Sequence, residues 1–195
     1  MKKRCAWAGD DPQMQTYHDE EWGVPLYDDQ KLFEFLILEG MQAGLSWSTI
    51  LKKRDNFRKA FDNFGASKIA RYRGARIEKL MNDASIIRNR MKIKAAISGA
   101  IAYLKIQNEF DSFHKYIWQF VGGKPIVNKW KTLNEIPVFT PEAEVMSKDL
   151  KKRGFNFVGP TICYAFMQAT GMVNDHTIDC FRYKQVLKWK RRSLE

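Results

Sequence analysis

The feature that most constrains the fold is the placement of potential metal ligands at both ends of the chain. Cys5 and His18 stand near the start, and His176 and Cys180 near the finish, in 195 residues that contain only three cysteines and three histidines. Thiolate and imidazole ligands suit zinc, and two of each form a tetrahedral structural site. If the four residues share one ion, the chain ends are adjacent and the residues between them form one closed domain.

The spacing within each pair is compatible with a single ion. His176 and Cys180 stand at positions i and i+4, so on a helix they would share a face. A loop that turns back on itself would bring Cys5 to His18. The competing interpretation is that each is an ordinary buried cysteine or a hydrogen-bonded histidine. Four protein ligands leave no open coordination position, so we expect a structural site. Cys163 stands in an apolar stretch and is expected in the core.

Length and composition favour one globular domain with a polyanionic partner. Hydrophobic residues make up 45% of the chain and aromatic residues 13%, enough for one sizeable core. Three unevenly spaced cysteines do not form a disulfide framework, and no stretch has the length and apolarity of a signal peptide or a membrane span. We therefore expect a cytoplasmic protein. The net charge of +11 favours nucleic acid as the partner, against a merely basic surface.

Helical periodicity dominates the sequence, so the predicted fold class is all-α. Aspartate, serine and threonine stand at N-cap positions before several apolar stretches, and glycine ends others. The expected helices cover 28–42, 47–61, 67–72, 75–82, 89–107, 112–121, 140–153 and 159–171, and a last one opens at 174 or 175. Residues 122–137 are expected to form a loop. We expect one compact domain over residues 1–184 and a basic tail over 185–195.

A short turn bounded by glycines joins the helices expected at 140–153 and 159–171. Gly154 permits a positive φ at the helix end, and Gly159 allows a ligand to approach the backbone. The next helix offers unpaired N–H groups and a positive dipole end to an anion. The pattern favours a DNA phosphate, held without sequence reading, over an ordinary pair of packed helices. The residues expected to contact DNA here are Lys151, Lys152, Arg153, Gly154, Gly159 and Thr161.

Glu39 stands near the end of an apolar helix, where burial without a partner is costly. A cationic ligand would be one such partner. The same N-terminal region contains Trp7, Tyr17, Trp22 and Trp47. Aromatic faces stack on bases and hold cationic rings more strongly than neutral ones. From these residues alone, the better interpretation is that Glu39 caps a helix or pairs with an arginine and the aromatic residues fill the core.

Six sequence stretches together favour a binding role for Glu39 and the aromatic residues over a purely structural one. They are 17–25 (YHDEEWGVP), 38–47 (LEGMQAGLSW), 51–54 (LKKR), 84–88 (ASIIR), 151–159 (KKRGFNFVG) and 173–176 (VNDH). Through them the chain closely resembles the 3-methyladenine DNA glycosylase I family, often called Tag, from Cys5 to about Cys180.

The resemblance implies an all-α helix-hairpin-helix glycosylase whose structural zinc joins the two ends of the chain. Its zinc ligands match Cys5, His18, His176 and Cys180, and its base pocket matches Glu39, Tyr17 and Trp47, with Trp7 beside them. Its DNA-backbone anchor matches the turn from Gly154 to Gly159, and Gly44 and Leu45 stand where the family presses a loop into the DNA stack. Met14 stands where some relatives carry a tyrosine.

The implied activity is release of 3-methyladenine from alkylated double-stranded DNA by a monomeric enzyme. Methylation makes the adenine cationic and weakens its glycosidic bond, and the enzyme must extrude the base to reach it. Glu39 is expected to read the edge and charge of the base, and Trp47 and Tyr17 to stack on it. The family lacks a catalytic aspartate, so Asp175 is not assigned catalysis. No lysine is placed as a nucleophile, which predicts an abasic site without strand cleavage.

Two other functions remain open. A non-catalytic zinc-containing DNA-binding module would bind DNA and release no base. A zinc hydrolase or nucleobase deaminase would need an open zinc site and a His-x-Glu signature, which His18, Asp19 and Glu20 fit. The partner motif Pro-Cys-x-x-Cys is absent from the sequence, and four protein ligands would close the site.

Overall fold

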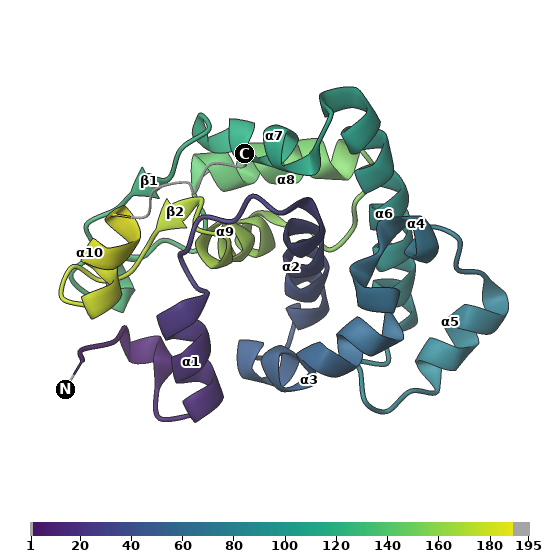
Figure 1. Cartoon of the computed structure of the whole chain (residues 1–195), viewed down its shortest axis with the longest axis horizontal. Helices are drawn as coiled ribbons and strands as arrows, with labels where there is room; N and C mark the ends of the chain where they lie inside the picture. The colour runs from purple at the N-terminus through teal and green to yellow at the C-terminus, as the bar shows by residue number, and fades with distance from the viewer. Residues whose placement is uncertain (1, 189–195) are drawn as a thin grey trace.

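A computed structural model describes residues 2–188, and this part of the chain is predominantly helical (Figure 1), as the sequence predicts. Most of the expected basic tail, residues 189–195, lies outside the described residues. The α-helices are α1 (Pro12–Glu20), α2 (Asp29–Gln42), α3 (Trp47–Ala60), α4 (Ala66–Ile69), α5 (Gly74–Met81), α6 (Arg90–Phe110), α7 (Phe113–Trp118), α8 (Pro141–Lys152), α9 (Pro160–Ala169) and α10 (Phe181–Leu187). Short 3-10 helices are η1 (Ala6–Ala8), η2 (Asp62–Phe64), η3 (Gln119–Val121) and η4 (Leu133–Glu135).

Side-chain caps begin the helices that position the site, where the sequence predicts them. The side chains of Asp28, Ser46 and Thr140 each accept a hydrogen bond from the backbone N–H three residues later, and they begin α2, α3 and α8. Such caps satisfy N–H groups that the helix itself leaves unpaired. Gly159 is the N-cap of α9 and Pro160 its first residue, which leaves the first N–H groups of α9 without a side-chain cap.

Helix α2 forms the centre of the molecule. It packs against α3, α6, α7 and α9, and α8 packs against α9 (Figure 1). Every residue from Leu32 to Met41 is buried, including two glutamates, Glu34 and Glu39. A helix that is buried on all sides needs partners for its polar groups. The surroundings of these two carboxyl groups therefore determine what α2 contributes to function.

Three parts of the chain differ from the sequence prediction. Helix α1 was not expected, because Pro12–Glu20 is mostly polar and lacks an apolar stripe. The expected loop 122–137 contains a short strand, β1 (Ile126–Val127), which pairs in parallel with β2 (Val173–Asn174). The expected helix over His176 and Cys180 is wrong, since β2 keeps the chain extended to Asn174 and α10 begins only at Phe181.

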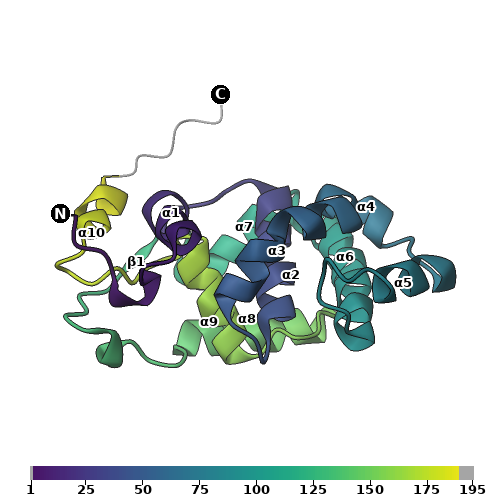
Figure 2. The ribbon, with the colours of Figure 1, turned by 90° about the horizontal axis from the view of Figure 1, so that it is seen from below.

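The N-terminal segment lies beside α10, and Figures 1 and 2 agree on this placement. The backbone N–H of Phe181 donates to the carbonyl of Lys3 at 2.9 Å, and the Lys3 ammonium pairs with Asp179. The two ends of the described chain therefore meet, as the metal-ligand pattern predicts. Within residues 2–188, no helix combines the length and apolarity needed to span a bilayer.

Candidate functional site

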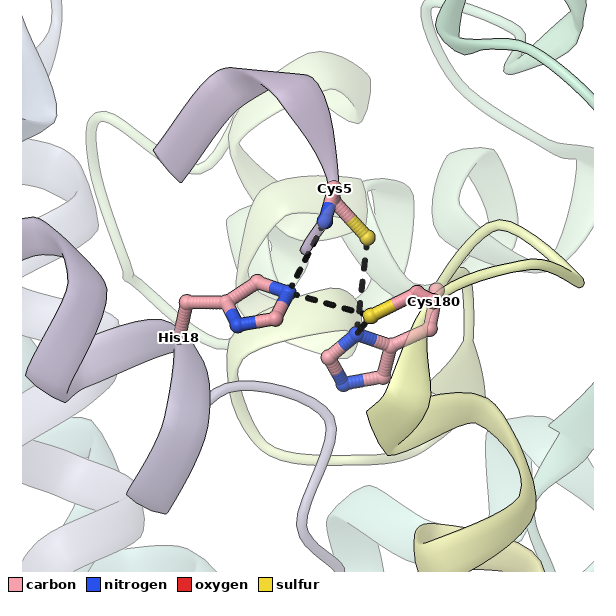
Figure 3. Close-up of side chains that lie close together, drawn as sticks. Cys5, His18 and Cys180 are labelled. Carbon is pink, nitrogen blue, oxygen red and sulfur yellow. Dashed lines mark hydrogen bonds between the residues drawn. The ribbon is translucent and has the colours of Figure 1, made fainter. Parts of the chain in front are cut away.

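The four potential metal ligands form one buried cluster, which we call the terminal clasp (Cys5, His18, His176 and Cys180). Their ligand atoms all lie within 4.8 Å of one another. Figure 3 shows Cys5 and His18, from the N-terminal segments, turned toward Cys180 at the start of α10. Sequence reasoning selected all four residues, although the turn that carries His176 and Cys180 is not the helix that it expected.

The distances within the terminal clasp fit a tetrahedral zinc site. The sulfur of Cys180 lies 3.4 Å from Nε2 of His18 and 3.6 Å from Nδ1 of His176. The sulfur of Cys5 lies 3.5 Å from Nδ1 of His176. With ordinary Zn–S and Zn–N bond lengths, sulfur and nitrogen ligands of a tetrahedral ion lie about 3.5 Å apart. The hydrogen bond between the two thiol groups lowers the pKa of Cys180 and raises the pKa of Cys5, so in the free protein the thiolate form is favoured at Cys180.

The surroundings of both histidines direct one ring nitrogen into the terminal clasp. Nδ1 of His18 donates to the Asp19 carboxylate at 2.8 Å, and Arg4 holds that carboxylate through two contacts of 2.8 Å. Nε2 of His176 donates to the carbonyl of Trp22 at 3.1 Å. Carboxylates and carbonyls only accept, so the opposite nitrogen of each ring carries the lone pair that a metal needs.

A cavity of about 200 Å³ opens beside the terminal clasp. It gathers side chains from η1, α1, α2, α3, α9 and the segment after β1. All four residues expected in the base pocket line it, and so do residues that sequence reasoning did not select. The lining residues are Trp7, Met14, Tyr17, Trp22, Glu39, Gln42, Trp47, Ile136, Ala165 and Gln168. We call this cavity the aromatic pocket.

Glu39 is the acidic residue among those that line the aromatic pocket, and its carboxyl group lacks a full set of partners. The side chain is 3% exposed, and Oε2 has no hydrogen-bond partner. Burial raises the pKa of Glu39 to about 8. The expectation from isolated residues, that Glu39 pairs with an arginine, is therefore wrong. A buried acceptor without a donor is poised to receive one from a ligand.

Aromatic rings enclose the same space. The ring centroids of Tyr17 and Trp47 are 5.3 Å apart, and those of Trp7 and Trp22 are 4.9 Å apart. The indole N–H groups of Trp7 and Trp47 are buried without an acceptor. The aromatic pocket thus has flat apolar walls, and three of its lining residues, Trp7, Glu39 and Trp47, each carry a buried polar atom without a partner, which suits a planar polar ring.

Asp175 has a structural environment. Its Oδ1 accepts hydrogen bonds from Asn128 and Trp130, both at 2.7 Å, and its Oδ2 accepts from Tyr164 at 2.6 Å and Gln168 at 2.8 Å. Every lone-pair direction of the carboxylate is in use, so none is left for a water or a substrate. This agrees with leaving Asp175 out of the catalytic residues. The carboxylate joins the segment after β1 to α9 and holds the Gln168 amide at the aromatic pocket.

The turn between α2 and α3 carries Gly44 and Leu45, which we call the wedge turn. Gly44 has φ +78°, and the Leu45 side chain is 43% exposed. The N–H of Leu45 donates to the carbonyl of Gln42 at 2.6 Å. An apolar side chain on a tight turn close to a pocket has the form of a group that enters a DNA stack.

The helices α8 and α9 and the turn between them form the α8–α9 hairpin. Gly154 has φ +105° and Phe157 has φ +55°, so the turn is tight on both sides. Lys151, Lys152, Gly154 and Thr161 are exposed along it. A Cβ on Gly159 would meet no atom within 4 Å. The first turn of α9 is therefore open to an anion.

Arg153 differs from its two lysine neighbours. Its guanidinium contacts Glu109 at 2.7 Å and Asp149 at 2.8 Å and lies over the rings of Phe110 and Tyr116. These ion pairs neutralise its charge and fix its direction, which weighs against a DNA phosphate as its partner. Its predicted DNA contact is the least supported of those along the hairpin.

Comparison with known proteins places these features in one family. The family model for methyladenine glycosylase matches residues 7–183. A relative in Escherichia coli (strain K12), DNA-3-methyladenine glycosylase 1, is 51% identical over 93% of this chain and 97% of its own length. A crystal structure of 3-methyladenine DNA glycosylase I superposes with a TM-score of 0.90 at 50% identity and covers 92% of this chain and 98% of that one.

A third comparison concerns the base itself. A Staphylococcus aureus structure, titled for the structural basis of 3-methyladenine recognition by its glycosylase I, superposes with a TM-score of 0.88. It is 40% identical to this chain and covers 91% of it and 94% of that chain. The family model, the sequence relatives and the superposed structures agree, and the chain belongs to the methyladenine glycosylase family.

Proposed function

We propose that this protein extrudes 3-methyladenine from alkylated double-stranded DNA and hydrolyses its bond to deoxyribose. The observation that carries the proposal is the buried, incompletely partnered carboxyl group of Glu39 at a cavity lined by aromatic rings. The E. coli relative is named for this activity, and the S. aureus structure is titled for recognition of this base. Both support the same substrate.

Charge provides the discrimination against normal adenine. In DNA the methylated base is cationic, whereas adenine is neutral. A cation in the aromatic pocket favours the ionised form of Glu39 and gains its attraction in a site with little water. Rings such as Tyr17 and Trp47 also hold a cationic ring more strongly than a neutral one. Adenine gains less from both interactions, so it stays in the helix.

Hydrolysis follows from the leaving-group ability of the base. When the glycosidic bond breaks, its electron pair moves onto the ring and neutralises the positive charge. Water adds its oxygen to the sugar carbon and loses a proton. No lysine stands among the described residues that line the aromatic pocket, and this supports a water nucleophile and an abasic product without strand cleavage.

DNA binding is proposed for two surfaces beside the aromatic pocket. The α8–α9 hairpin, with Lys151, Lys152 and the first N–H groups of α9, holds a phosphate of the DNA backbone. The wedge turn inserts Leu45 where the base has left the stack. The net charge of +11 supports a polyanionic partner.

We propose that the terminal clasp holds one structural zinc ion. The fit of its distances and the fixed histidine nitrogens support this assignment. Four protein ligands would leave the ion no open position for substrate. When bound, the ion would cross-link the two chain ends. This cross-link would keep Trp7 and Tyr17 against α9 at the aromatic pocket. We further propose one helix-hairpin-helix domain over residues 1–184, active as a cytoplasmic monomer.

The decisive experiment treats methylated duplex DNA with the protein and identifies the freed base by chromatography. We expect 3-methyladenine in the supernatant and intact strands that carry abasic sites. Glu39→Gln should release the base about 10- to 100-fold more slowly, because it removes a charge-assisted interaction in a buried site. Glu20→Gln makes the same change on an exposed position of α1 and serves as the control.

The two parts of the proposal fail separately. Wild-type protein that binds the DNA and frees no base contradicts the glycosylase function and favours a non-catalytic binding module. Wild-type rates in Glu39→Gln contradict the role of Glu39 and leave the function standing.

A further inference from the structure

Lys92 is a buried lysine whose function the glycosylase mechanism above does not explain. It lies in the first turn of α6, and the residue is only 6% exposed. Its ammonium group donates to the carbonyl of Met41 at 2.8 Å and to the carbonyl of Ala43 at 2.6 Å. Burial lowers the pKa of Lys92. A buried ammonium is costly and persists where its hydrogen bonds hold something in place.

The two carbonyls that Lys92 holds belong to the end of α2. The last carbonyls of a helix have no partner within the helix and carry the negative end of its dipole, so a cation stabilises them. Ala43 is also the residue that leads into the wedge turn. Lys92 therefore fixes the direction in which the chain leaves α2 toward Gly44 and Leu45.

The same lysine contacts the α8–α9 hairpin. Its ammonium lies 6.0 Å from the centre of the Phe157 ring, and Phe157 occupies the left-handed region at φ +55°. Gly40, in the last turn of α2, lies so close to this residue that a Cβ there would stand 3.4 Å from both Cβ and the carbonyl oxygen of Phe157. Lys92 thus stands where the end of α2, the start of α6 and the hairpin turn meet.

We propose that Lys92 is a positioning residue that sets the wedge turn relative to the α8–α9 hairpin. DNA held at the hairpin then meets Leu45 at the position where the extruded base leaves a gap. The inference rests on the proposed function, because it assumes that these two surfaces contact the same duplex. It assigns Lys92 no contact with the base or with the reacting sugar.

A direct phosphate contact is the rival role for any lysine in a DNA-binding protein. Two of the three ammonium protons of Lys92 are already donated to carbonyls, and little of the side chain reaches solvent. A phosphate contact and a positioning role predict different effects of salt concentration on DNA affinity. Loss of a phosphate contact lowers the slope of log affinity against log salt concentration by about 1, whereas loss of a positioning residue leaves that slope unchanged.

The test is a double-mutant cycle with Lys92→Met and Leu45→Ala. Affinity is measured for a duplex that contains a tetrahydrofuran abasic site, across a series of salt concentrations. Affinity for free 3-methyladenine is measured by tryptophan fluorescence. Lys94→Met removes the same charge from an exposed position of α6 and is the matched control. If Lys92→Met does not fold, Lys92→Gln, which keeps one donor group, replaces it in the cycle.

We expect Lys92→Met to weaken duplex binding about tenfold in the wild-type background and about twofold or less when Leu45 is already alanine. The salt slope and the affinity for free 3-methyladenine should stay at wild-type values. Lys94→Met should bind like wild type. Additive losses, a smaller salt slope, or an equal loss of free-base affinity would each overturn the positioning role. Failure of the wild-type protein itself to bind the abasic duplex would instead contradict the proposed function.

Discussion

Two buried glutamates of α2 show how the surroundings of one residue type separate structure from function. Glu34 accepts from Arg54 at 2.7 Å and pairs with Arg58 at 2.9 Å, so its charge is neutralised inside the protein. Glu39 lies further along the same helix and has an acceptor atom that nothing satisfies. The first stabilises the junction of α2 and α3, and the second is available to a ligand.

The burial of Glu39 predicts a pH-dependent cost to the free protein. Its pKa rises from the ordinary value of 4.5 to about 8 in the fold, so between these values only the unfolded chain ionises. The free energy of unfolding should therefore fall as pH rises through this window and level off above it. Glu39→Gln lacks this loss. The free energy of unfolding of Glu39→Gln minus that of wild type, measured with urea, should therefore be a few kcal/mol larger at pH 8.5 than at pH 5.

Other ionisable groups contribute equally to the stability of wild type and Glu39→Gln, so their contributions cancel in the difference between the two proteins at each pH. An equal stability difference at pH 5 and pH 8.5 would mean that Glu39 ionises normally in the fold. That result would remove the argument that a cationic base is its missing partner.

The family resemblance selected Trp7, Tyr17, Glu39 and Trp47 for the pocket, but it did not select Gln42 on the same helix as Glu39 or the residues that tertiary structure brings in. An acid within an apolar helix is unusual, but the residues alone favoured a structural role for Glu39 and a core role for the aromatic residues, and the family resemblance changed that interpretation. Ala165 and Gln168 reach the aromatic pocket from α9, and Ile136 reaches it from the segment after β1. No local pattern marks them. Arg153 was selected as a DNA contact because the sequence shows its positive charge. The sequence does not show the two carboxylates that neutralise this charge in the fold.

At the scale of elements, the α8–α9 hairpin contains two glycines with different physical needs. Gly154 has a positive φ, which an L side chain rarely adopts. Gly159 has an ordinary φ of −63° and open space around it. The fold requires glycine at the first position. At the second, the fold would accept alanine, so the absence of a side chain there favours close approach by a ligand.

We therefore expect opposite results from the two alanine variants. Gly154→Ala should lose about 1 kcal/mol of stability through backbone strain. Gly159→Ala should keep the wild-type melting temperature and bind duplex DNA about tenfold more weakly, because its methyl group meets the phosphate backbone. Thermal unfolding and fluorescence anisotropy with a labelled duplex measure the two effects. Unchanged DNA affinity in Gly159→Ala would place the phosphate elsewhere.

Helix prediction succeeded where caps and apolar periodicity agree, and it missed α1, which has a cap without the periodicity. The starts of α2, α3 and α8 carry both signals. Helix α1 has a capping aspartate, Asp11, but mostly polar residues follow it. The segment after β2 contains the i and i+4 spacing of a helix, yet parallel pairing with β1 and the buried Asp175 hold it in an extended and turned path. Long-range pairing of this kind leaves no trace in local sequence.

At the scale of the whole molecule, the terminal clasp joins segments from the two ends of the described chain. Arg4, Asp19, Lys3 and Asp179 add ion pairs around it, but these are partly exposed. Exposed ion pairs contribute little to stability. We therefore expect the four buried residues of the terminal clasp and the ion proposed between them to contribute more to this closure than the ion pairs do.

Cys180→Ala should remove the metal and destabilise the protein by about 4 kcal/mol or more, because loss of a structural metal belongs to the most damaging class of substitutions. Cys163→Ala changes a buried cysteine outside the terminal clasp and is the matched control. Inductively coupled plasma mass spectrometry measures the metal content, and urea unfolding measures the stability. Equal zinc content in Cys180→Ala and wild type would reject the proposed site.

The meeting of the two chain ends also sets the order of events during synthesis. Cys5 and His18 leave the ribosome early, but their partners His176 and Cys180 are among the last described residues to be made. The terminal clasp can therefore close only after Cys180 has been made. A chain that ended before α9 would lack Ala165 and Gln168, one wall of the aromatic pocket, and a chain that ended before His176 would lack two residues of the terminal clasp.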